Sequence, residues 1–112
     1  MVTSRSGARW IVPKGILEPD LSPAASAAKE AFEEAGVEGR VLPKPVGEYS
    51  YEKWGGICQV EVFAMRVTDL FDEWDEDFRD REWVSLVTAI ERVREPELKD
   101  ILSDLPLLVG VR

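Results

Sequence analysis

The chain has 112 residues, and 14 Lys and Arg against 22 Asp and Glu give it a formal net charge of −8. The length fits a single domain, and the acidic balance argues against nucleic-acid or anionic-membrane binding, since both depend on clustered cations. The sequence contains no His, which excludes His-based triads and His-ligated zinc.

The first half of the chain predicts a strand, a loop and a helix. Residues 10–12 form an apolar run that stops at Pro13, as a short strand would. Ser22 and Pro23 predict a helix start, because Ser caps free N–H groups and Pro is tolerated at the first helical position. We expect the helix to cover residues 24–35 and to end at Gly36.

The second half predicts further strands followed by two helices. The expected strands are 37–42, 47–51, 60–67 and 81–84, with a hairpin across residues 55–56, and the expected helices are 85–94 and 97–105. Residues 68–82 are dense in carboxylates, which favours a solvated acidic surface over a second metal site. Helices that follow and separate strands indicate an α/β or α+β domain.

Three carboxylates occupy one side of the first helix. Glu30, Glu33 and Glu34 are three and four residues apart, so they share a face. They lie near the negative end of the helix dipole and repel one another, which costs ~0.3–1 kcal/mol each. A divalent cation such as Mg²⁺ or Mn²⁺ would reverse that balance. The alternative is a solvated acidic helix face.

The segment from Gly15 to Val37 resembles the Nudix box, G-x5-E-x7-R-E-U-x-E-E-x-G-U, in register over residues 15–37. Further similarity over residues 9–13, 73–74 and 81–83 is to the diphosphoinositol polyphosphate phosphohydrolase and dinucleoside polyphosphate hydrolase subgroup. The resemblance implies a single Nudix domain over residues 1–112, an α/β/α sandwich with a mixed sheet.

The resemblance also implies a catalytic site. Glu30 and Glu34, with the Gly15 carbonyl, would hold Mg²⁺ (or Mn²⁺) against a diphosphate that water attacks. Glu33 would be a further ligand or an orienting group. Glu34 is our principal ligand, and Glu30 is the first choice for the general base.

Two positions depart from the box, because Leu21 replaces its early Glu and Lys29 replaces its Arg. These residues brace the loop in the family, so we expect an apolar contact from Leu21 in place of an ionic brace. The segment before Met1 that the family normally has is absent from this sequence. An N-terminally short sheet would expose an edge. Either the start site is assigned late, or a partner chain covers this edge, and a homodimer is the milder prediction.

The expected function is metal-dependent hydrolysis of a diphosphate linkage in a nucleoside- or inositol-linked polyphosphate, with Arg5, Arg9 and Lys14 as candidate phosphate-binding residues. The alternative is a Nudix-fold ligand-binding or regulatory module without turnover. Because Cys58 is the single cysteine and no apolar leader or membrane-spanning run is present, we expect a cytoplasmic protein.

Overall fold

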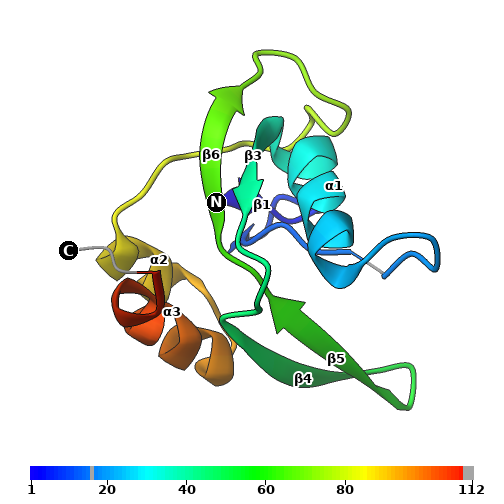
Figure 1. The fold of residues 1–112 in the computed structure, drawn as a ribbon, viewed down its shortest axis with the longest axis vertical. Coiled ribbons are helices and arrows are strands. Elements are labelled where there is room, and N and C mark those ends of the chain that lie inside the picture. The colour runs from blue at the N-terminus through cyan, green and yellow to red at the C-terminus, as the bar shows by residue number, and fades with distance from the viewer. Residues whose placement is uncertain (16, 110–112) are drawn as a thin grey trace.

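The computed structural model describes residues 1–15 and 17–109, which form six strands and three helices (Figure 1). Residue 16, in the loop expected after Gly15, lies outside the described residues. The strands are β1 (Val2–Thr3), β2 (Trp10–Ile11), β3 (Val37–Val41), β4 (Gly47–Lys53), β5 (Gly56–Val62) and β6 (Met65–Leu70). The helices are α1 (Pro23–Ala35), α2 (Leu86–Arg92) and α3 (Pro96–Val109).

Both predicted ends of α1 are confirmed. The Ser22 side chain accepts a hydrogen bond from the Ala25 N–H at 3.1 Å, and Pro23 follows as the first helical residue. At the other end, Gly36 has φ 65°, and its N–H donates to the Phe32 carbonyl at 3.0 Å. A left-handed residue of this kind ends many helices, and glycine adopts it without a Cβ penalty.

The predicted strand 60–67 is wrong as a single element, since the chain bends after Val62. Residues before the bend belong to β5, which forms a hairpin with β4, and residues after it belong to β6, which pairs with β3. The Leu42 N–H donates to the Ala64 carbonyl at 2.9 Å and holds the bend in place. Apolar alternation continues through such a bend, so it does not reveal a change of partner. The expected strand 81–84 is reduced to an isolated bridge between Val2 and Arg81.

The helices cover the strands from two sides (Figure 1). Helix α1 packs against β3, whereas α3 packs against α2 and β4. This layering confirms the α/β fold. The expected mixed sheet is wrong for the described residues, which form three separate antiparallel ladders. Helix α1 does connect β2 to β3, but these two strands belong to different ladders, and Pro13 lacks the N–H that would extend β2.

The buried core lies between the β4–β5 hairpin and the two C-terminal helices. Tyr49 of β4 packs there with Val93, Leu98 and Ile101. No helix in the described part of the chain is both long and apolar enough to cross a lipid bilayer.

Gly36 and Gly55 both have positive φ, and Gly36 is expected to tolerate a side chain less well than Gly55 does. A Cβ at position 36 would lie 2.8 Å from the Trp74 Cβ and 2.8 Å from an Arg81 nitrogen, whereas Gly55 (φ 75°) has open space around it. The left-handed backbone alone costs an Ala residue ~1–2 kcal/mol, and overpacking adds ~1–3 kcal/mol. In urea denaturation, Gly36→Ala should therefore lose about twice the free energy of unfolding lost by the control Gly55→Ala. Equal losses would contradict the packing seen at Trp74.

Candidate active site

The turn after β2 brings Gly15 directly against α1. A Cβ built on Gly15 would overlap the carboxyl group of Glu30, so the backbone at Gly15 and the end of the Glu30 side chain lie close together. The structure thus places the glycine and the first helix carboxylate of the box side by side, although they are 15 residues apart in the sequence.

Glu34 lies one helical turn after Glu30 and is buried, with 3% of its surface exposed. Burial raises its pKa to about 8, and a hydrogen bond with the Glu30 carboxyl acts in the same direction. The positive charge of Arg79 opposes this shift, with its Nη2 3.7 Å from Glu34 Oε1. A carboxyl group kept this dry beside a second carboxyl is an unusual feature for a helix surface.

Arg79 holds the acidic segment over the C-terminal half of α1. It is 7% exposed, donates from Nη1 to the Thr3 carbonyl at 2.8 Å, and donates from Nη2 to Glu76 Oε1 at 2.9 Å. The Glu76 N–H in turn donates to the Glu33 carbonyl at 2.9 Å.

The prediction of a solvated surface is therefore wrong for Arg79 and Glu76. Arg79 is the single cation among residues 67–80 of the sequence, and this is the sequence feature that could have marked it as a structural residue. An arginine within a run of acidic residues could form an ion pair with any of several carboxylates. The sequence alone therefore does not identify Glu34 as a partner of Arg79.

Glu33 forms an ion pair with Lys29, one helical turn before it. Its Oε1 lies 3.8 Å from Lys29 Nζ, which also donates to Glu18 Oε1 at 2.6 Å. The hydrogen bond with Glu18 is the main reason why the pKa of Lys29 is raised. An ionic brace between the loop and the helix is thus present, formed by Glu18 and Lys29. The expectation that the ionic brace is lost at Leu21 is therefore wrong, because Glu18, three positions earlier in the sequence, supplies the carboxylate.

The three candidate phosphate-binding cations fall into two groups. Arg5 is 77% exposed at its side chain and lies 3.5 Å from Glu76, the carboxylate that also pairs with Arg79. Arg9 pairs with Glu95 at 3.3 Å, and Lys14 lies 4.7 Å above the ring centroid of Tyr51. Only Arg5 belongs to the network that reaches Glu34.

The donor set at Gly15, Glu30 and Glu34 fits a hard cation. Among the described residues no three acidic or Cys side chains converge as a closed metal cage. Mg²⁺ does not need one, since it is usually bound through one or two carboxylates and retains waters or substrate phosphates in its remaining positions. Burial and the neighbouring Glu30 carboxyl disfavour the ionised form of Glu34 and raise its pKa. A bound cation would favour the ionised form and offset the repulsion between the two carboxylates.

The pKa of Glu34 predicts how stability without metal depends on pH. Because this pKa is about 8 in the folded chain and 4.5 in the unfolded one, the folded state retains a proton that the unfolded state loses between these values. The stabilisation is complete below pH about 4.5 and is lost as pH rises through about 8, by on the order of 1 kcal/mol per pH unit.

Thermal unfolding from pH 5 to 9 measures this effect. The melting temperature should fall more steeply with pH for the unmodified chain than for Glu34→Gln, and millimolar Mg²⁺ should reduce the difference by binding the ionised carboxylates. Parallel pH profiles for the two proteins would contradict a raised pKa at Glu34.

Comparison with known proteins identifies the family to which the chain belongs. Residues 1–105 match the NUDIX domain, so the chain belongs to the Nudix family. The identification made from the box over residues 15–37 is therefore confirmed, together with the α/β fold.

Three proteins that are similar in sequence to this chain are named as hydrolases. It is 34% identical over 113 residues to "Nudix hydrolase 16, mitochondrial" of Arabidopsis thaliana, an alignment that covers 93% of this chain and 62% of that protein. It is 35% identical to diphosphoinositol polyphosphate phosphohydrolase 3-beta of Bos taurus and 36% identical to the 3-alpha protein of Mus musculus, each over 110 residues, 94% of this chain and 66% of the relative. The chain thus spans just under two thirds of the length of these relatives.

Proposed function

We propose that this chain is a metal-dependent pyrophosphohydrolase that cleaves a diphosphate linkage by attack of water. The observation that carries the proposal is the contact between Gly15 and Glu30 with the buried Glu34 one turn away. Membership of the Nudix family and the similarity to proteins named as hydrolases support it.

In this proposal Gly15, Glu30 and Glu34 hold Mg²⁺, with Mn²⁺ as a second candidate. The ion would neutralise charge on the diphosphate and lower the pKa of water. Glu34, held by Arg79, is the principal ligand. Glu30 accepts the proton of the attacking water, whose oxygen bonds to phosphorus as the anhydride P–O bond breaks and the leaving phosphate takes the electron pair. Glu33, paired with Lys29, keeps the role of an orienting group or further ligand.

The substrate class in the proposal is a nucleoside- or inositol-linked polyphosphate. Two of the relatives are named for diphosphoinositol polyphosphates. The net charge of −8 works against the most highly phosphorylated ligands, so dinucleoside polyphosphates are an equal candidate. Arg5, Arg9 and Lys14 would bind phosphate, and each would exchange its present partner for the substrate.

A substrate panel tests the proposal. Phosphate release from diphosphoinositol polyphosphates and dinucleoside polyphosphates is measured with millimolar Mg²⁺, with Mn²⁺ and with EDTA. Turnover of at least one class that EDTA abolishes is the expected result. Saturable binding of a panel member without turnover at any metal concentration would instead support a ligand-binding module.

Two further expectations belong to the same proposal. The free thiol of Cys58 fits a reducing compartment, and we propose the cytoplasm. A homodimer is proposed as the alternative to a monomer, and sedimentation of the purified chain distinguishes them.

A further inference from the structure

The turn of the β4–β5 hairpin holds a large aromatic side chain in solvent. Lys53 pairs with Gly56, so the turn consists of Trp54 and Gly55, and it lies at the end of the hairpin away from α2 and α3 (Figure 1). Trp54 is 91% exposed, and a Cβ built on Gly55 would have no atom of the described residues within 4 Å apart from its chain neighbours. The indole of Trp54 therefore contributes nothing to the buried core.

The backbone of this turn is poorly suited to tryptophan. Trp54 has φ 53° and Gly55 has φ 75°, the two positive values of a type I′ turn. Asn, Asp and Gly are the residues that favour such a turn. For a residue such as Trp the left-handed conformation is disfavoured roughly 5- to 30-fold. Backbone strain at an exposed aromatic residue points to a role other than folding.

A lysine next to the turn does not account for the tryptophan. Lys53 Nζ lies 4.4 Å from the centroid of the Trp54 ring. An exposed cation–π contact favours the arrangement by roughly 2- to 5-fold, which is less than the backbone disfavours it. Because Trp54 is almost fully exposed, the second face of its indole is open to solvent. The turn thus presents a flat aromatic face beside a positive charge.

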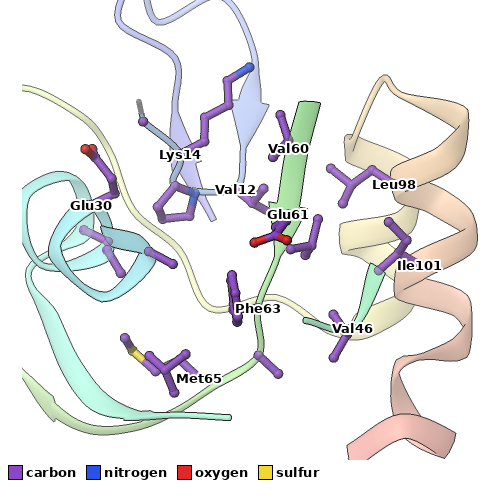
Figure 2. Close-up of a pocket in the computed structure, with 18 of the residues that line it drawn as sticks. Val12, Lys14, Glu30, Val46, Val60, Glu61, Phe63, Met65, Leu98 and Ile101 are labelled. Atoms are coloured by element: carbon purple, nitrogen blue, oxygen red, sulfur yellow. The ribbon is translucent and has the colours of Figure 1, made fainter. Parts of the chain in front are cut away.

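A second pair of a cation and an aromatic ring connects this turn to the candidate site. Lys14, the neighbour of Gly15, has its Nζ 4.7 Å from the centroid of the Tyr51 ring. Figure 2 shows Lys14 at the edge of the pocket that Gly15 lines, with its side chain directed out of it. Alternate residues of a strand share a face, so Tyr51 and Lys53 project from the same side of β4. From Tyr51 to Trp54 the strand rises about 10 Å.

A nucleotide has the chemistry that matches this arrangement. Its phosphates are anions and its base is a flat aromatic ring. Every base has a π-face, and stacking on an aromatic side chain strengthens binding by roughly 5- to 150-fold per base. An inositol ring is saturated and carries phosphates around it, so it presents no aromatic face to an indole and requires several cations. Lys53 is the single cation among residues 45–65 of the sequence.

We propose that Trp54 is a specificity-determining residue, whose indole stacks on the base of a nucleoside-linked polyphosphate. Lys14 and Lys53 lie on the side of β4 along which the phosphates run toward Gly15 and Glu30. The inference rests on the proposed function, and it selects the nucleoside-linked class from the two candidates named there.

Two probes that resist hydrolysis separate the base from the diphosphate. α,β-Methylene-ADP carries adenosine on a diphosphate analogue, and methylenediphosphonate is that analogue alone. In titration calorimetry of the 112-residue chain with millimolar Mg²⁺, the nucleotide analogue should bind at least ~10-fold more tightly than methylenediphosphonate. It should also quench tryptophan emission, since the base would lie on an indole.

Variants of the hairpin assign the effect to Trp54. Trp54→Asn removes the indole and supplies a residue that favours the turn, so the melting temperature should not fall. Its affinity for α,β-methylene-ADP should fall at least ~10-fold, to that for methylenediphosphonate, and the quenching should disappear. Trp54→Phe retains an aromatic face and should retain most of the binding. Ile57→Ala is the matched control, because Ile57 is 74% exposed and pairs with Glu52 on the other face of the hairpin.

Failure of this inference is distinguishable from failure of the proposed function. Equal affinities of the two probes, or full binding of the nucleotide analogue by Trp54→Asn, would overturn the inference while Mg²⁺-dependent binding of methylenediphosphonate still supported the metal site. If neither probe binds in a Mg²⁺-dependent way, the proposed metal site is refuted, and the inference that rests on it is refuted as well.

Discussion

Glu34→Gln is expected to reduce metal-dependent phosphate release at least ~100-fold, which is the low end of the effect of losing a positioned carboxylate from such a site. The amide keeps the shape of the side chain but offers a cation only a neutral oxygen. Initial rates on whichever panel substrate is turned over, at saturating Mg²⁺, give the measurement.

Two properties of the site make this substitution informative. Since the pKa of Glu34 is about 8, the group is mostly protonated at pH 6, and Gln there should leave the melting temperature almost unchanged. A loss of rate is then not a loss of fold. Glu38→Gln, an exposed carboxylate on β3, serves as the control and should retain full activity. Activity of Glu34→Gln that matches this control would refute the assigned chemistry.

Arg79→Met is expected to lower the free energy of unfolding by ~3–5 kcal/mol, the range seen when one partner of a buried ion pair is removed. The substitution leaves the Thr3 carbonyl and the Glu76 carboxylate without their shared donor and removes the cation beside Glu34. Urea denaturation near pH 7 measures the loss.

Arg5→Met is the matched control, because Arg5 contacts the same Glu76 oxygen from solvent. An exposed pair of this kind contributes ~0–1 kcal/mol. At pH 9, above the pKa of about 8 at which Glu34 ionises, combining Arg79→Met with Glu34→Gln should recover part of the stability, since the double variant no longer has a buried carboxyl group that must ionise without its cationic partner. Strictly additive losses would show that Arg79 and Glu34 are not coupled.

The sequence alone was sufficient for the local features around the candidate site. The Ser22-Pro23 start and the Gly36 stop of α1 depend on capping by neighbouring residues, and they were predicted correctly for that reason. The spacing of the box likewise identified the family. The residue types at Glu30 and Glu34 set which metals could bind, since ligand chemistry belongs to the side chain.

Only the tertiary structure determined which of these groups meet. Glu30 is brought against Gly15, Glu34 is buried under Arg79 from 45 positions downstream, and Glu33 is turned toward Lys29. The bend after Val62 was likewise determined by tertiary structure, because strand partners are chosen by long-range pairing that apolar alternation does not encode. Local hydrogen bonds and steric preferences act between neighbours in the chain and can be read from it, whereas burial and charge pairing depend on which distant segments pack together.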